Sequence, residues 1–405
     1  ARGYVSAPFT IYENVWTLPP GHRLSLQTEP YTAGENLSES MEPYWSPLDA
    51  MEQARGAAHE MTDAQAIEEF SEILGECVRE RMISDVPLGA FLSGGIDSSA
   101  IVALMQKFSD QPIKTYTIGF EESGFNEADF AAKIAAHLGT EHNELYLGPD
   151  EALAVIPSLP DIYDEPFADI SAIPTYLVSK FARSEVTVAL SGDGGDEMLG
   201  GYNRYLAGPK IWNRARWLPS SLRKVIAHGV RAVPIEKWDE FFPKSPQAGS
   251  SIHKAASILS MNSQEEIYKR LTRQGEKNLV LKEGAVSPYF PNAKNLGFAE
   301  KMMLWDAIGY LPNDILVKVD RASMATSLEA RAPLLDRKIF EYSWSLPEKF
   351  KIRRGQGKWL LREVLKKHVP ETLYERPKQG FNMPIGAWLR GPLKDWGAAL
   401  LEPSR

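Results

Sequence analysis

Short apolar segments alternate with amphipathic ones between residues 86 and 191, and this alternation restricts the fold more than any other feature of the sequence. The apolar segments predict strands at 86–93, 113–120, 143–148 and 185–191, and the amphipathic ones predict helices at 98–107, 127–139 and 172–182. Apolar strands separated by helices are typical of a parallel sheet that is covered on both faces. The sequence therefore predicts an α/β fold built on a doubly wound parallel sheet.

The segments on either side of this region have different patterns. Residues 1–50 are rich in proline, glycine and aromatic residues, and a Pro-Pro-Gly-His turn predicts a hairpin between strands at 10–18 and 22–28. Residues 64–82 have the spacing of an amphipathic helix. After about residue 200 we expect no further strands, so the second half of the chain is predicted to be mainly α-helical.

Composition narrows the class of function. The formal net charge of −8 argues against nucleic acid as the main partner, although a local basic patch is compatible with that charge. The single cysteine, Cys77, excludes a disulfide framework and a cysteine-ligated zinc site, and its place in a predicted helix indicates a core position. No apolar run reaches the ~18–20 residues of a membrane span, so we expect a cytoplasmic enzyme without a membrane partner. The chain begins with Ala1 rather than Met, from which we expect an upstream part to be missing.

The segment AFLSGGIDSSA, residues 90–100, joins a predicted strand to a predicted helix through a glycine turn. A helix N-terminus at such a turn offers N–H groups to an anion, and Gly94 and Gly95 remove Cβ atoms that would obstruct it. Asp97 would repel a bare phosphate but suits a phosphate that carries Mg²⁺. No lysine follows the glycines, so the turn is not the common P-loop and suits a phosphate that leaves as magnesium pyrophosphate. A β–α turn without function is the alternative for a glycine pair taken alone.

The segment VALSGDGGDEMLGGYNRY, residues 188–205, repeats this arrangement. A predicted strand ends in Ser-Gly, and Asp193, Asp196 and Glu197 follow within five positions. Carboxylates this close together are unfavourable unless a cation lies nearby. A solvated acidic turn is the alternative for this motif alone, but two strand-end turns of one style favour Asp97 and Asp196 as the two ligands of a Mg²⁺ ion.

Charged residues recur further along the chain. Those in 317–336 are predicted to form mainly buried ion pairs between the two halves of the chain, and they are Lys318, Asp320, Arg321, Glu329, Arg331 and Asp336. Lys358 differs because it follows two glycines at the start of a predicted helix, where a cation is unfavourable unless an anion lies nearby. An ion pair with Glu363 or a surface acid is the alternative for Lys358.

Four motifs in this order resemble one family. LSGGIDSS, at 92–99, resembles the pyrophosphate loop of the PP-loop ATP pyrophosphatases. Together with SGDGGDE, LEARAPLLD and GKWLLRE, it makes the chain similar to the synthetase domain of glutamine-dependent asparagine synthetases over about residues 60–395. The resemblance implies a PP-loop (HUP-like) fold, and residues 1–55 resemble the end of that family's glutaminase domain and its linker. The synthetase domain is then expected at 56–405, with a nucleotide-binding α/β part at about 60–205 and a helical part at about 206–405.

The resemblance also implies a two-step reaction that uses ATP and Mg²⁺. ATP adenylates the side-chain carboxylate of aspartate and releases pyrophosphate, and ammonia then displaces AMP to give asparagine. The family's N-terminal cysteine nucleophile is not in this sequence, so we expect this chain to use free ammonia and to have the glutaminase domain of the full-length protein as a partner. A homodimer is compatible with the sequence.

Site residues are implied motif by motif. The residues expected to hold the ATP phosphates and magnesium are Leu92, Ser93, Gly94, Gly95, Asp97, Ser98 and Ser99. Ile118 is expected at the adenine, and Ser191 and Gly192 at the nucleotide. Asp193 stands where many asparagine synthetases have Glu, near the reacting carboxylate and ammonia, and Lys358 matches the lysine that stabilises the intermediate.

Related synthetases that amidate other acids remain open as alternatives. These are enzymes that form β-lactams or macrolactams and amidotransferases that act on sugar uronic acids. β-Lactam synthetases have Tyr where this chain has Asp193, so Asp193 favours ammonia over an internal amine as the nucleophile. A tRNA-modifying PP-loop protein is disfavoured by the net charge of −8.

Overall fold

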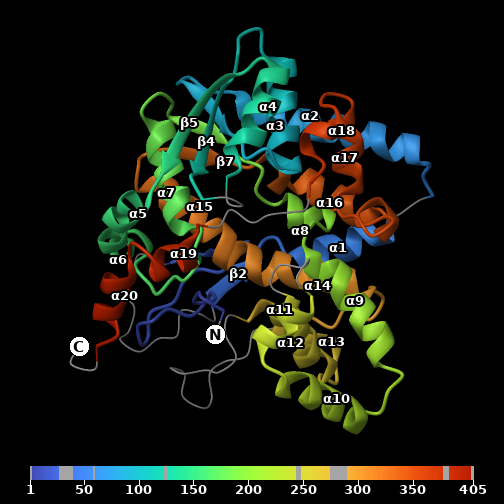
Figure 1. Ribbon diagram of the computed structural model, residues 1–405. Coiled ribbons are helices and arrows are strands. Elements are labelled where there is room, and N and C mark those ends of the chain that lie inside the picture. The colour runs from blue at the N-terminus through green and yellow to red at the C-terminus, as the bar shows by residue number, and fades with distance from the viewer. Residues whose placement is uncertain are drawn as a thin grey trace.

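A five-stranded parallel sheet with the strand order β5-β4-β3-β6-β7 forms the centre of the protein (Figure 1). The structure is a computed structural model, and it describes residues 2–26, 40–57, 60–122, 126–242, 248–273, 290–376 and 383–402. The strands are β3 (Leu88–Phe91), β4 (Lys114–Phe120), β5 (Glu141–Leu147), β6 (Val188–Leu190) and β7 (Glu329–Arg331). All four pairings between neighbouring strands are parallel. The predicted α/β fold with a parallel sheet is confirmed.

The strand order places both predicted glycine turns at one point of the sheet. From β3 the chain moves outward through β4 to β5, and it then returns to add β6 and β7 on the other side of β3. β3 and β6 are therefore neighbours whose following segments leave in opposite directions. In doubly wound sheets, the crevice at the carboxyl ends of two such strands is the usual ligand site.

Helices cover both faces of the sheet (Figure 1). On one face α4 (Ala128–Leu138) packs on β4 and β5 and contacts α3 (Ile96–Phe108), which in turn packs on α2 (Asp63–Met82) and α17 (Trp359–Lys366). On the other face α7 (Ala172–Arg183) packs on β4 and on α15 (Leu316–Met324). Each face has its own cluster of buried hydrophobic side chains, and Cys77 lies in the first, fully buried as predicted.

The remaining elements are mostly helices. They are α1 (Pro47–Gly56), α5 (Pro149–Val155), η2 (Ile156–Ser158), α6 (Leu159–Tyr163), α8 (Gly195–Leu199), α9 (Asn203–Ala215), α10 (Ser220–Ala232), α11 (Ile235–Phe241), α12 (Ala248–Leu259), α13 (Gln264–Thr272), α14 (Phe298–Trp305), the π-helix η3 (Asp306–Ile315), η4 (Pro333–Leu335), α16 (Arg337–Ser345), η5 (Glu348–Phe350), α18 (Glu371–Tyr374), α19 (Ile385–Arg390) and α20 (Lys394–Leu400). Within the described ranges, no helix combines the length and the apolar character that crossing a membrane requires.

The prediction that strands end near residue 200 is wrong for β7. This strand has three residues, with Glu329 and Arg331 on either side of Ala330, so it shows neither an apolar run nor an alternation long enough to recognise. Pairing with the neighbouring strand β6 specifies β7 instead. The Glu329 N–H donates to the Thr187 carbonyl over 2.9 Å, and the Ser191 N–H donates to the Arg331 carbonyl over 2.8 Å.

The predicted N-terminal hairpin is also wrong. β1 (His22–Leu24) pairs antiparallel with β2 (Met41–Pro43) instead of with the segment at 10–18. Trp16 of that segment instead forms an isolated bridge with Phe9, just before the segment. The Gly21 carbonyl accepts from the Tyr44 N–H over 2.8 Å, so the turn predicted between two strands pairs with a later part of the chain. Residues 27–28 of the second predicted strand lie outside the described residues.

Candidate active site

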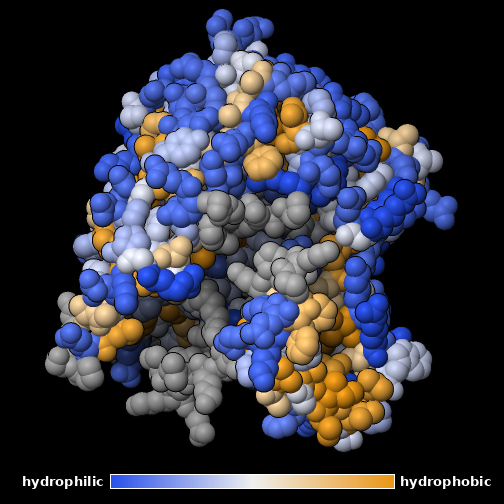
Figure 2. Space-filling view, viewed as in Figure 1, coloured by the Kyte–Doolittle hydropathy of each residue, from blue (hydrophilic) through white to orange (hydrophobic). Residues whose placement is uncertain are grey.

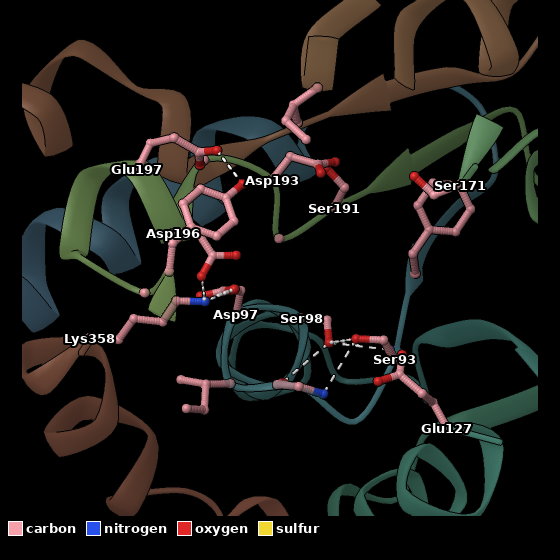
Figure 3. A pocket seen from close by; sticks show the side chains of 18 of the residues that line it. Ser93, Asp97, Ser98, Glu127, Ser171, Ser191, Asp193, Asp196, Glu197 and Lys358 are labelled. Atoms are coloured by element: carbon pink, nitrogen blue, oxygen red, sulfur yellow. Dashed lines mark hydrogen bonds and ion pairs between the residues drawn. The ribbon is translucent and has the colours of Figure 1, made fainter. Parts of the chain in front are cut away.

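A cavity of about 560 Å³ lies at the carboxyl ends of β3 and β6, and both glycine turns line it (Figure 3). Residues 355–358 line it from the other half of the chain. The crevice that the strand order predicts is therefore present, and three of the sequence motifs meet in it.

The first glycine turn holds its shape through backbone and hydroxyl contacts. Gly94 has a φ of +71°, and a Cβ built there would lie 2.8 Å from the Ala131 nitrogen at the start of α4. The Ser93 N–H donates to the Ser98 hydroxyl over 3.2 Å, and the two hydroxyl oxygens lie 3.0 Å apart. Only glycine fits at position 94, because the turn combines a left-handed conformation with close packing against a helix.

The amino end of α3 is open toward the cavity. Gly95 is its N-cap residue and supplies no side-chain cap to the first N–H groups of the helix. Gly95, Asp97 and Ser98 all line the cavity. Backbone N–H groups at the start of a 13-residue helix, with their dipole, suit a phosphate group.

The glycines of the second turn allow it to pack directly against the first. A Cβ on Gly192 would lie 2.7 Å from the Ser98 nitrogen and 2.8 Å from Asp97 Cβ, and a Cβ on Gly195 would overlap the Asp97 carboxylate. Close approach to the start of α3 therefore requires both glycines. The sequence predicts that the glycines of the first turn make room for a bound anion. The structure shows that the glycines of the second turn make room for the first turn.

Lys358 joins Asp97 and Asp196, one carboxylate from each turn (Figure 3). Its Nζ hydrogen-bonds the Asp97 carboxylate and lies 2.7 Å from Asp196 Oδ1, and the residue is 6% exposed. Burial lowers the pKa of Lys358, but Asp196 and Asp97 raise it by more, so the ammonium keeps its charge. The alternative partner is not used, because Glu363 pairs with Lys366 over 2.8 Å.

The backbone carries Lys358 into the cavity from the helical half of the chain. Lys358 is the N-cap residue of α17 and has a φ of +60°. Its N–H donates to the Leu199 carbonyl over 2.8 Å. The preceding Gly357 packs against the backbone of Gly200, where a Cβ would overlap the carbonyl group.

Asp193 and Glu197 lie beside this trio at the cavity wall. Burial raises the pKa of the Asp193 carboxyl, and the Lys318 ammonium opposes that shift. Burial and the neighbouring Asp196 raise the pKa of Glu197, which accepts a hydrogen bond of 2.6 Å from the Tyr202 hydroxyl. The second turn therefore holds two carboxyl groups whose pKa values burial raises, Asp193 and Glu197.

Asp97 and Asp196 fit the predicted magnesium ion as a pair of hard oxygen donors. Among the described residues, no group of three or more His, Cys, Asp and Glu side chains is arranged to hold a metal. Mg²⁺ in nucleotide sites typically takes one or two carboxylates and completes its shell with phosphate oxygens and water. Two carboxylates that converge on one ammonium at the cavity wall match that requirement.

Of the charged residues at 317–336, Lys318 and Asp336 form ion pairs of the predicted kind, whereas the pairs of Arg321, Glu329 and Arg331 differ from the prediction. Lys318 is buried and lies 2.9 Å from Asp169, and Asp336 pairs with Arg81 over 2.8 Å, so both pairs connect the two halves of the chain. The pair of Arg321 with Asp164 is exposed. Arg331 pairs with its neighbour Glu329.

Two predicted site residues do not line the cavity. Ser99 is fully buried and is not part of the lining, so its predicted contact with ATP stays a prediction. Gly94 is also outside the lining, and the role that the structure gives it is in the shape of the turn. The other residues predicted for ATP are all part of the lining, namely Leu92, Ser93, Gly95, Asp97, Ser98, Ile118, Ser191 and Gly192.

Sequence reasoning missed Glu127 and Arg376, which hold the outer side of the first turn. Arg376 Nη2 donates to the Ser93 carbonyl and to Glu127 Oε1, both over 3.1 Å. Burial raises the pKa of Glu127 to about 7, and the opposing effect of the Arg376 charge does not cancel this rise. Glu127 lies seven positions after the end of β4, so the rule that sites lie at strand ends could have found it. No local sequence pattern identifies Arg376 as a site residue.

A second group that the sequence did not reveal lies at the inner wall. Asp169 and Ser171 hold the Lys318 ammonium, each over 2.9 Å. Asp314 lies on the π-helix η3, and burial, with the nearby Asp169 charge, raises its pKa to about 7. π-Helical turns often occur at functional sites, but the sequence of η3 has the spacing of an ordinary helix.

Comparisons with known proteins agree with this geometry. Residues 69–405 match the family model described as asparagine synthase. The chain is 35% identical over 346 residues to asparagine synthetase [glutamine-hydrolyzing] 1 of Bacillus subtilis, an alignment that covers 84% of this chain and 53% of that protein. It is 32% identical over 412 residues to a putative asparagine synthetase of Mycobacterium tuberculosis, covering 99% of this chain and 60% of the relative. It is also 24% identical over 417 residues to amidase chry2 of Gibberella zeae, covering 95% of this chain and 60% of the relative.

The chain thus spans little more than half the length of these relatives, and the matched region contains both glycine turns and Lys358. A family match over 69–405, together with the meeting of these motifs in one cavity, leads to one conclusion. The chain belongs to the asparagine synthase family.

Proposed function

We propose that this chain activates a carboxylic acid with ATP and transfers ammonia to it, forming an amide, AMP and pyrophosphate. The observation that carries the proposal is the convergence of Asp97, Asp196 and Lys358 on the open amino end of α3. The phosphates of ATP would lie on the first turn, and Ile118 would line the adenine site from β4. Membership of the asparagine synthase family supports this class of reaction.

The first step would form the acyl adenylate. An oxygen of the substrate carboxylate attacks the α-phosphorus of ATP, the bond to the bridging oxygen of the β-phosphate breaks, and pyrophosphate leaves with that electron pair. Asp97 and Asp196 would hold Mg²⁺, which would neutralise charge on the phosphates. Lys358, preorganised in a buried site, would stabilise the negative charge that builds at the reacting phosphate.

The second step would form the amide. Ammonia attacks the acyl carbon, the carbon–oxygen bond to AMP breaks, and the nitrogen loses a proton. Asp193 lies at the cavity wall, and burial raises the pKa of its carboxyl, which would make it a better acceptor for that proton than an exposed aspartate. Burial raises the pKa of the Cys77 thiol to about 12, so this cysteine is unsuited to releasing ammonia from glutamine.

We propose aspartate as the acid, because two of the relatives compared above are named asparagine synthetases. The match to amidase chry2 leaves amidation of a different acid as the second candidate. A screen for pyrophosphate release separates the two. Purified chain, ATP and Mg²⁺ are incubated with a panel of carboxylic acids, with and without ammonium.

Aspartate is expected to give the fastest pyrophosphate release, with asparagine formed only when ammonium is present. The variants Asp97→Asn and Asp196→Asn are expected to abolish the release, and Lys366→Ala is the matched control because its ammonium pairs at the surface. Faster release with another acid would assign the second candidate function. If none of the acids supported release, the proposal would be overturned.

A further inference from the structure

Helix α10 presents an apolar stripe to solvent. Leu222, Val225, Gly229 and Ala232 follow one another at intervals of three, four and three residues, which places them on one face of the helix. Leu222 is 45% exposed and Val225 is 68% exposed, and a Cβ built on Gly229 would meet no atom within 4 Å. Figure 2 shows hydrophobic residues gathered over α10 at the lower right of the molecule.

The opposite face of α10, which packs on the protein, is anchored by an arginine. Arg223 and Ala227 are buried there. The Arg223 guanidinium donates to the Leu259 carbonyl over 3.4 Å and to the Met261 carbonyl, so it caps the carboxyl end of α12. An amphipathic helix normally turns its apolar stripe to the core. Here a polar anchor fixes the helix and leaves the apolar stripe outside.

The part of the sequence that contains this stripe has basic residues and no acidic ones. The sequence has no Asp or Glu between Glu197 and Glu236, although the chain as a whole carries a net charge of −8. That interval contains seven Lys and Arg residues, and the exposed ones include Arg214 in the last turn of α9, Arg216 before α10 and Lys224 on α10. α12, on which α10 packs, contains no acidic residue either. The nearest acids in sequence are the three on α11, beyond the end of α10.

A tryptophan stands at the edge of the stripe. Trp217 is 78% exposed in the turn before α10, and the Arg216 guanidinium lies 5.3 Å from the centre of its ring. The indole of Trp217 therefore faces solvent instead of packing in the core. Tryptophan side chains of this kind are enriched at the boundary between lipid headgroups and acyl chains.

We propose that the α10 patch binds the surface of an anionic phospholipid bilayer. We define the patch as Trp217, Leu222, Val225 and Ile226 with Arg214, Arg216 and Lys224. A bilayer accommodates apolar side chains between its acyl chains and presents phosphates to flanking bases, so it satisfies both halves of the patch. Nucleic acid would pair with the bases and leave the stripe in water, and a second copy of the chain would bring the same bases face to face.

This proposal concerns a surface contact and is independent of the proposed reaction. The expectation of no membrane partner came from the absence of a long apolar run. A helix that lies in the bilayer interface needs an apolar face of ordinary length and basic flanks, which α10 has.

Flotation with lipid vesicles tests the proposal on the whole chain. Vesicles of phosphatidylcholine are compared with vesicles that also contain phosphatidylglycerol, at low salt and at about 1 M salt, where the Debye length is about 3 Å. We expect binding at least ~10-fold tighter to the anionic vesicles at low salt, and near loss of that difference at high salt. The double variants Leu222→Ser/Val225→Ser and Arg216→Gln/Lys224→Gln should each weaken binding by ~10-fold or more.

Ile83→Ser is the matched control, because Ile83 is 76% exposed outside the patch. Circular dichroism and the rate of pyrophosphate release show that each variant is folded. Equal binding to the two kinds of vesicle, or none to either, would overturn the proposal. So would patch variants that bind vesicles normally but lose RNA binding, or that change only the oligomeric state measured by light scattering.

Discussion

At the scale of single residues, Lys358 combines an unfavourable backbone conformation with a favourable charge environment. Its φ of +60° is uncommon for a residue with a side chain and costs of order 1 kcal/mol. Such a conformation persists only when its surroundings enforce it. Here the backbone contact with Gly200, the hydrogen bond to Leu199 and the two carboxylates hold it in place. The strain therefore accompanies the placement of an ammonium where the proposed reaction needs one.

Lys358→Ala removes that ammonium and leaves two half-buried carboxylates near each other. Pyrophosphate release should fall by at least ~10²-fold, because a preorganised transition-state contact is lost. Without metal, the free energy of unfolding should fall by ~3–5 kcal/mol, because the acids lose their buried partner. Mg²⁺ should then stabilise Lys358→Ala more than the wild type, since metal no longer competes with the ammonium. Thermal unfolding in a Mg²⁺ titration measures this.

Lys366→Ala is the control for this variant, because Lys366 is 40% exposed and should contribute under ~1 kcal/mol. Activity of Lys358→Ala close to that of the control would make Lys358 a structural residue. Equal stabilisation of wild type and variant by Mg²⁺ would contradict a metal site at Asp97 and Asp196.

Arg376→Gln tests the outer support of the first turn. The variant loses the bond to the Ser93 carbonyl and leaves Glu127 buried without its charge partner, so the turn should loosen. We expect ATP affinity, measured by calorimetry, to fall by ~10-fold, with partial recovery in Arg376→Lys. Arg337→Gln is the control, because Arg337 is 70% exposed and pairs with Glu341 at the surface. Unchanged ATP affinity in Arg376→Gln would show that the contact is dispensable.

At the scale of elements, the site depends on how closely neighbouring segments approach. The turn after β6 touches the start of α3 through Gly192, and the segment before α17 touches the end of α8 through Gly357. Sequence reasoning recognised the glycines but could not see which backbone each one meets, because those partners are about 95 and 160 positions away. Segments with strong local patterns, such as β4 and α2, were predicted within a few residues. β7 and the β1–β2 pair were not, because long-range partners specify them.

Gly192→Ala should disrupt this contact. The added Cβ would lie 2.7 Å from a backbone nitrogen that cannot yield without moving α3. We expect a loss of ~1–3 kcal/mol in stability and a larger proportional loss of activity, because the two carboxylates separate. Gly229→Ala has open space and should be neutral or slightly stabilising. Denaturant unfolding measures the free energy of unfolding of both variants, and equal stability of the two would refute the contact between the turns.

The π-helix η3 gives the fold a pH dependence through Asp314. Burial raises the pKa of Asp314 to about 7, so the folded protein keeps this proton over a range in which the unfolded chain releases it. The stability that this proton provides is complete below about pH 4 and is lost as the pH rises through about 7. Asp314→Asn lacks this loss, so its melting temperature relative to wild type should rise between about pH 5 and pH 8. A difference that stays constant with pH would contradict a raised pKa.

At the scale of the whole molecule, the sequence predicted the sheet and the motif residues of the site better than it predicted the residues that hold those motifs in place. The alternation at 86–191 led to the sheet, and three of the four motifs led to residues of the cavity lining, whereas LEARAPLLD does not reach the cavity. Arg376, Asp169 and Ser171 were missed, because they come from segments without chemical pattern and reach the site only through the fold. The exposed face of α10 was missed for a related reason: periodicity shows that a helix has an apolar face but not which way it turns.

The central claim is that the cavity couples ATP to a carboxylate through an adenylate, and an isotope test addresses it most directly. Aspartate labelled with oxygen-18 in its side-chain carboxylate is incubated with the chain, ATP, Mg²⁺ and ammonium, and the phosphorus products are separated and analysed by mass spectrometry. We predict AMP that carries one labelled oxygen, together with unlabelled pyrophosphate, because the carboxylate oxygen bonds to the α-phosphorus and leaves with AMP. ADP with labelled orthophosphate would instead show attack at the γ-phosphorus and would contradict the assignment of the two turns and Lys358.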